Sequence, residues 1–158
     1  MKKLFAYTLL ILFTLGFSSR LRDDKQLFDS SPATRLDAII AQEKQLLESS
    51  SQGWMLQYYA GKDYTGAGYT LLMKFENGKV SIMGDNGDPE LIATSDYDIV
   101  KDQGPVLTFP TFNGVIHPLA SASLGHPEGI QGDYEFVILE ASQDRIRLRG
   151  KKWKNEMT

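Results

Sequence analysis

The sequence has no cysteine among its 158 residues, and this absence removes several chemistries at once. No disulfide, thiolate nucleophile or cysteine-ligated metal can form, and no thiol is present to carry a lipid. Basic residues are also scarce, since 17 Lys and Arg stand against 20 Asp and Glu. Phosphate binding depends on a basic excess, so we expect a partner other than nucleic acid.

Long hydrophobic runs are confined to the N-terminus. Leu4–Phe17 is a nearly unbroken apolar segment, preceded by Lys2 and Lys3 and followed by two serines. This order is typical of a secretory signal peptide. As a helix the run would span only about 21 Å, short of the ~30 Å hydrocarbon core of a bilayer. We predict a signal peptide over residues 1–19, export of the remainder, and no transmembrane helix after cleavage.

The remaining chain has the composition of one packed domain, with 42% hydrophobic residues overall. Residues 20–31 are polar and are predicted to form a tether, followed by a single domain over residues 32–158. Ser31 is a suitable N-cap and Pro32 suits the first helical position, so we expect an amphipathic helix over residues 32–51. Its predicted apolar stripe consists of Leu36, Ile39, Ile40, Leu46 and Leu47.

After Gly53 the sequence changes to short aromatic and β-branched runs separated by turn formers. Strands are expected at Trp54–Ala60, Tyr69–Phe75, Lys79–Met83, Asp96–Lys101, Pro105–Phe109, Tyr134–Glu140 and Arg145–Lys152. Asn77-Gly78 predicts a tight hairpin turn. Successive hairpins predict a mainly β (α+β) fold, with one N-terminal helix packed on an antiparallel sheet that is barrel- or sandwich-like. Arginines occupy one face of the last strand, and we expect them to pair with Glu135 or Glu140.

Several segments of the chain together resemble a known family. They are Leu21–Asp29 with Ser31–Leu36, Gly53-Trp54 with Tyr58-Tyr59, Gly68-Tyr69 with Leu72–Phe75, and Asp102–Phe109 with Gly132–Val137. In this combination the chain is similar to the N-terminal part of domain-of-unknown-function family 4302, a family of exported bacterial lipoproteins. The resemblance implies a surface or periplasmic protein encoded near nutrient-uptake systems, and it supplies no catalytic residue.

The chain departs from the family pattern at two points. Arg20 stands where the pattern would place the acylated cysteine of a lipoprotein. Because a guanidinium cannot accept that acyl group, we expect no lipid anchor at Arg20. Family members are several hundred residues long, so the chain is predicted to be a shortened relative.

No sequence motif specifies a catalytic centre, since zinc-protease, nucleophile-elbow and phosphate-loop patterns are all missing. Both histidines fall in the irregular stretch 113–133, and each precedes a proline, which favours extended loop backbone. The aromatic rings of Trp54, Tyr58, Tyr59, Tyr64 and Tyr69 could stack on a sugar, although we expect most of them in the core or on a sheet face, with Tyr64 exposed. The candidate ligand-binding residues are Tyr64, Trp54, Tyr58, His117 and His126.

We therefore predict a non-catalytic extracytoplasmic binding or accessory module without a metal or cofactor. Its expected location is the periplasm, the outer-membrane surface or the medium, and its expected partner is a small molecule, a glycan or a protein. Two alternatives remain at this point. One is a hydrolase that uses the 113–133 loop, and the other is a truncated structural fragment of a larger lipoprotein.

Overall fold

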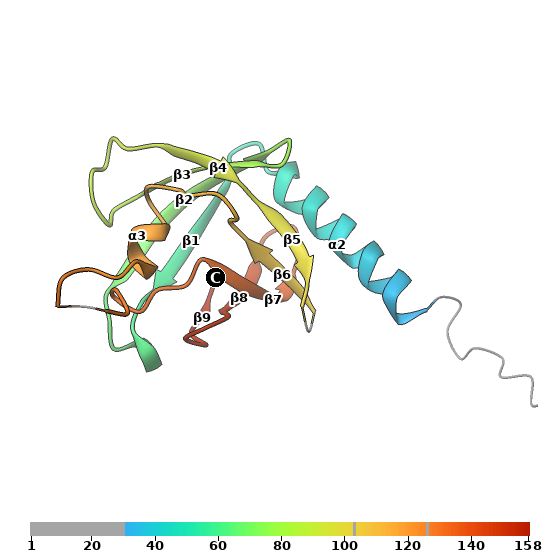
Figure 1. The fold of residues 1–158 in the computed structure, drawn as a ribbon. Helices are drawn as coiled ribbons and strands as arrows, with labels where there is room; N and C mark the ends of the chain where they lie inside the picture. Colours follow the sequence, from blue (N-terminus) through green and yellow to red (C-terminus); the bar gives the residue numbers. More distant parts are fainter. Residues whose placement is uncertain (1–30, 103, 126) are drawn as a thin grey trace, which may run out of the picture. The chain divides into compact units, whose positions relative to one another are not determined.

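The computed structural model describes residues 31–102, 104–125 and 127–158, and residues 32–158 form one compact unit (Figure 1). The predicted signal peptide, Arg20 and His126 lie outside the described residues. The helices are α2 (Pro32–Ser49), the short 3-10 helix η1 (Lys62–Tyr64) and α3 (His117–Ala120). None of them is both long and apolar enough to cross a bilayer within the described ranges.

The strands form two antiparallel sheets in which each strand pairs with the next one along the chain. Sheet A has the order β1 (Trp54–Tyr59), β2 (Gly68–Glu76), β3 (Lys79–Gly84) and β4 (Ala93–Asp96). Sheet B has the order β5 (Asp98–Lys101), β6 (Pro105–Thr108), β7 (Glu135–Ala141), β8 (Ile146–Gly150) and β9 (Glu156–Met157). The predicted mainly β class with one N-terminal helix is therefore confirmed.

The two sheets face each other and meet along two edges. Tyr97 alone separates β4 from β5, so the chain passes directly from one sheet into the other. At the opposite edge, the Gln57 backbone N–H donates a hydrogen bond to the Thr158 carbonyl at 2.8 Å. Of the two arrangements predicted from the sequence, the described strands form the sandwich-like pair of sheets and not a closed barrel.

Most predicted strands are confirmed, with three corrections. The predicted strand Asp96–Lys101 is divided at Tyr97, whose side chain turns into the core and is only 6% exposed. Strands β4 and β9 were not predicted, and α3 lies in the stretch expected to be an irregular loop. The predicted Asn77-Gly78 turn joins β2 to β3, and both residues have positive φ angles, 51° and 75°.

The helix buries most of the predicted stripe, since Leu47 is buried and Leu36, Ile40 and Leu46 are half-buried. It ends at Ser49, and its buried residues are Glu43 and Leu47, which continue a row begun by the half-buried Leu36 and Ile40. Spacings of four, three and four residues place this row on one side of a helix. Ile39, expected in the apolar stripe, is 45% exposed because it lies beside this row.

Ion pairs attach α2 to sheet B along one flank. Lys44 contacts Asp98 and Asp37 contacts Lys101, both at 2.5 Å, so the helix lies alongside β5 (Figure 1). Each of these exposed pairs contributes little energy, and both lie on the flank of α2 that faces β5.

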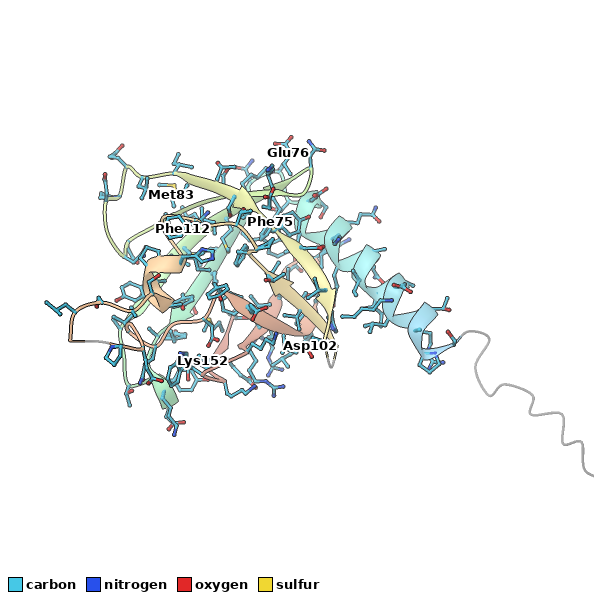
Figure 2. The ribbon with its side chains drawn as sticks, viewed as in Figure 1. Phe75, Glu76, Met83, Asp102, Phe112 and Lys152 are labelled. Atoms are coloured by element: carbon cyan, nitrogen blue, oxygen red, sulfur yellow. The ribbon has the colours of Figure 1, made fainter. Side chains whose placement is uncertain are left out.

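Aromatic rings fill the middle of the sandwich. Tyr58 of β1 meets Phe136 of β7 edge to face at 6.2 Å, and Phe136 meets Phe109 at 6.3 Å. All three side chains are fully buried. The strand alternation is visible on β2, where Phe75 is buried in the core and Glu76 lies at the exposed hairpin tip (Figure 2).

A buried hydroxyl group connects the two sheets. The Tyr58 hydroxyl donates to the Asp133 carbonyl at 2.9 Å and accepts from the Asp133 N–H at 2.6 Å. The Asp133 carboxylate in turn accepts from the N–H groups of Lys152 and Trp153 at 2.7 and 3.1 Å. Sheet A is thereby joined to the segment before β7 and to the turn between β8 and β9.

We predict that Tyr58→Phe lowers the free energy of unfolding by about 2 kcal/mol, because both backbone groups of Asp133 lose their partner in a buried site. Urea unfolding monitored by circular dichroism measures this change. Tyr69→Phe is the matched control, since the hydroxyl of this half-buried residue makes no hydrogen bond within the described part of the chain. Equal losses for the two variants would contradict the role of the Tyr58 hydroxyl.

Candidate functional site

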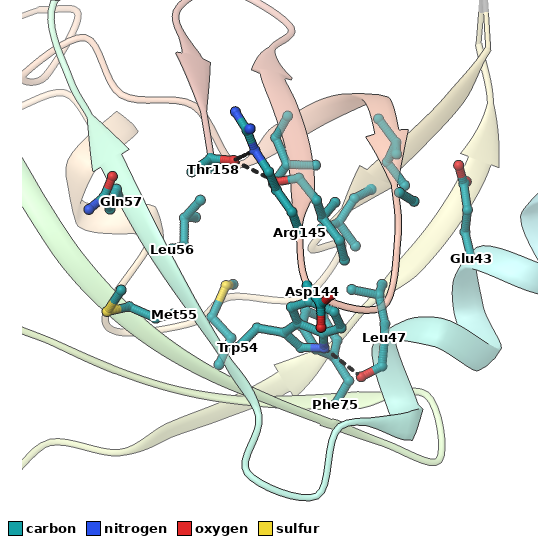
Figure 3. A pocket seen from close by; sticks show the side chains of 16 residues that line it. Glu43, Leu47, Trp54, Met55, Leu56, Gln57, Phe75, Asp144, Arg145 and Thr158 are labelled. Carbon is teal, nitrogen blue, oxygen red and sulfur yellow. Dashed lines mark hydrogen bonds between the residues drawn. The ribbon is translucent and has the colours of Figure 1, made fainter.

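An apolar cavity of about 240 Å³ lies between the two sheets near the C-terminal end of α2 (Figure 3). Its walls come from α2, β1, β2, β6, β7 and β8. The apolar side chains that face one another across it include Leu56, Met73, Phe75, Leu107, Ile138 and Leu148. Its polar residues are Glu43, Gln57, Asp144, Arg145 and Thr158.

A tight connection between α2 and β1 places Trp54 in the wall of this cavity. Gly53 has a φ angle of 79°, and a Cβ atom there would lie 2.6 Å from the Met73 carbonyl oxygen. Only glycine therefore suits this close approach. The following Trp54 donates its indole N–H to the Leu47 carbonyl at 2.9 Å, a hydrogen bond drawn in Figure 3.

A second, more open space adjoins the apolar cavity. This outer cavity, of about 870 Å³, lies between α2 and the β7–β8 turn. Glu43, Ala141 and Asp144 line both spaces. These three residues, which we call the neck, therefore mark the place where the apolar cavity meets the more open outer one.

Glu43 is the unusual member of the neck. It is only 9% exposed, and its Oε2 atom has no hydrogen-bond partner within the described residues. Burial raises the pKa of Glu43 from its ordinary value of 4.5 to about 7. The side chain therefore changes charge close to neutral pH, next to an apolar cavity.

Arg145 supplies the basic group of the cavity wall. Its Nε donates a hydrogen bond to the Thr158 hydroxyl at 3.2 Å. The Thr158 hydroxyl in turn donates to the Ile146 carbonyl, also at 3.2 Å (Figure 3). Within the described part of the chain, Arg145 makes no ion pair. The guanidinium is thus held by neutral groups only.

Arg147 of β8 and Lys151 in the following turn pair with acidic side chains on the outer face of sheet B, whereas the buried Nε atom of Arg149 has no hydrogen-bond partner among the described residues. Arg147 contacts Glu140 at 3.6 Å and Glu156 at 2.8 Å, and Lys151 contacts Glu135 at 3.4 Å. Pairing with Glu135 and Glu140 is the arrangement predicted from the sequence. This face is therefore a solvated, charge-paired surface.

The aromatic residues predicted as ligand contacts do not lie together. Trp54 lines the apolar cavity, whereas Tyr58 is fully buried in the aromatic core. Tyr64 is 52% exposed, as predicted, and its hydroxyl accepts a hydrogen bond from the Glu156 N–H at 2.8 Å. Its ring contacts Tyr59 edge to face at 5.8 Å. The structure thus divides the predicted stacking platform between three places.

His117 begins α3, so the prediction of extended backbone at this residue is wrong. Its Nδ1 atom accepts a hydrogen bond from the Asn113 N–H at 3.0 Å. The ring stacks on Tyr134 at 4.7 Å and contacts Phe112 at 5.4 Å. Burial lowers the pKa of His117. The described residues contain no cluster of three side chains able to hold a metal ion, and this histidine organises the turn around α3.

Comparison with family models gives one match, to a domain of unknown function, DUF4302, over residues 24–158. The chain belongs to this family. The resemblance found from the sequence is confirmed, and the match includes α2, both sheets and the cavity. Neither the curated proteins nor the solved structures contain a match to the chain.

Within this DUF4302 domain, Glu43 is the site residue that sequence reasoning missed. The prediction of the buried stripe considered apolar residues only. It therefore omitted Glu43, although this residue lies on the same side of the helix as Ile40 and Leu47. The spacing of four residues from Glu43 to Leu47 was the available signal.

We predict that Glu43→Gln stabilises the protein at pH 8 by roughly 2 kcal/mol and has little effect at pH 4. The pKa of Glu43 is raised on folding, from 4.5 to about 7, so the folded chain binds more protons than the unfolded chain between these values. Stability from this group is thus lost as the pH rises through that window. Urea unfolding of both proteins at the two pH values measures the difference, and a variant that is less stable at pH 8 would contradict it.

A second pH effect is expected at His117. Because burial lowers its pKa below the ordinary 6.5, the folded chain binds fewer protons, and stability falls as the pH drops below 6.5. His117→Asn keeps an acceptor for the Asn113 N–H but cannot titrate. We predict that thermal melts from pH 7.5 to 5.5 show a smaller loss for the variant. An unchanged loss would assign the pH dependence to other groups.

Proposed function

We propose that this DUF4302 domain is an exported, non-catalytic module that binds a small apolar molecule between its sheets. The observation that carries the proposal is the unfilled apolar cavity of about 240 Å³ with a neck toward a more open space. Apolar cavities of about 150 Å³ already accept benzene, so this one has room for a ring or a short alkyl chain.

The energetic cost of the cavity supports a binding role. Protein interiors are close-packed, so an apolar space of this size costs the side chains that line it part of their packing energy. An apolar ligand would recover part of that energy through contacts with side chains such as Met73, Leu107 and Ile138. The cavity is therefore a better site for an apolar ligand than for water.

Two further features support the details of the proposal. The basic and apolar order of the first 19 residues supports export. The separation of Trp54, Tyr58 and Tyr64 favours an apolar molecule over a glycan, because a sugar platform needs its rings side by side. The engagement of His117 in the α3 turn favours binding over hydrolysis at the 113–133 stretch.

We predict that 1-octanol binds to the purified protein with a saturable change in Trp54 fluorescence. Ala141→Leu places three additional carbon atoms at the neck and should weaken binding by at least about tenfold through steric exclusion. Isothermal titration calorimetry provides the affinities.

Ala67→Leu is the matched control, because the same change at this exposed residue lies away from the cavity. It should bind 1-octanol as the unmodified chain does. Failure of the unmodified protein to bind 1-octanol, or equal binding by Ala141→Leu, would refute the proposal.

A further inference from the structure

The neck of the cavity contains a carboxyl group with an unused hydrogen-bonding atom. Glu43 is nine-tenths buried, and Oε2 has no partner within the described residues. A buried carboxyl group is costly unless a partner compensates it. Because Glu43 lines both the apolar and the outer cavity, a ligand that occupies either space would lie against its side chain.

The charges around Glu43 favour a cationic partner. Asp144, also in the neck, adds a second acidic side chain from the β7–β8 turn. Glu140 lines the outer cavity and is paired with Arg147. On the helix itself, Lys44 is committed to Asp98.

Arg145, the basic residue in the wall of the apolar cavity, does not offset the acidic charge of the neck. Arg145 bonds to the Thr158 hydroxyl, which lies on the β9 side of the cavity, whereas Glu43 belongs to α2 (Figure 3). On the opposite flank of the helix, Asp37 and Lys101 neutralise each other. The neck therefore has two acidic groups and no basic group of its own among the described residues.

Three classes of polar group on an apolar ligand can be compared at this neck. A carboxylate would add like charge next to Glu43 and Asp144. A hydroxyl could share one hydrogen bond but would leave the glutamate charge uncompensated. An ammonium group offers up to three donors together with a positive charge, which gives the stronger, charge-assisted type of hydrogen bond.

We infer that the ligand is an apolar amine, with its hydrocarbon part in the apolar cavity and its ammonium group on the Glu43 carboxylate. This inference rests on the proposed function and adds the chemical class of the ligand. It also gives Glu43 a role in ligand selection, because replacing its carboxylate would remove the preference for a cation.

Amine binding should depend on pH with a defined sign. A primary ammonium with a pKa near 10, like that of lysine, stays charged throughout the range from pH 5.5 to 8. Glu43, with a pKa of about 7, must lose its proton to form the ion pair. The affinity for the amine should therefore rise as the pH increases through 7.

The test compares octylamine, 1-octanol and octanoate, which share one chain length, by calorimetry at pH 8. Octylamine is expected to bind at least about tenfold more tightly than 1-octanol, and octanoate more weakly than both. The amine affinity should fall by about tenfold or more at pH 5.5. Glu43→Gln should abolish the amine preference, so that the affinity ratio of amine to alcohol approaches one.

Glu76→Gln is the matched control, since it removes the same charge at the exposed β2–β3 hairpin tip and should keep the preference (Figure 2). Octanol binding without an amine preference, or a preference that survives in Glu43→Gln, would overturn this inference and leave the proposed function standing. Failure of all three octyl compounds to bind would overturn both.

Discussion

The spacing between the two sheets depends on the buried Tyr58 hydroxyl. It bonds to both backbone groups of Asp133, and the Asp133 carboxylate holds the turn between β8 and β9. The rings of Phe136 and Phe109 fill the same region. These contacts join the two sheets in the aromatic core, whereas the space between the sheets toward the end of α2 is lined by apolar side chains that leave a cavity. The apolar cavity is the space that remains there.

The attachment of α2 explains why this space has a neck. Ion pairs from Lys44 and Asp37 hold the helix against β5. The flank that carries Glu43 instead faces the outer cavity beside the β7–β8 turn. The helix thus brings to the apolar cavity a carboxyl group whose Oε2 atom has no hydrogen-bond partner among the described residues, and this combination of shape and charge underlies the proposed ligand class.

The sequence specified the architecture better than the site. Turn chemistry such as Asn77-Gly78 and the aromatic strands predicted the order of hairpins. Trp54, a candidate ligand contact, lines the apolar cavity, and its role in binding stays a prediction. Strand β4 was not predicted because Ala93–Asp96 contains no large apolar residue. It forms through its pairing with β3. The burial of Tyr58 and Glu43, by contrast, depends on contacts with residues distant in sequence, which no local pattern specifies.

Methionine methyl resonances test the central claim most directly. Met73 lines the apolar cavity and is 4% exposed, whereas Met83 lies outside the cavity, on β3 (Figure 2). During titration with 1-octanol, two-dimensional proton–carbon NMR should show a saturable shift of the Met73 methyl signal and an unchanged Met83 signal. A shift at Met83 with none at Met73 would place binding on the outer surface and contradict a ligand site between the sheets.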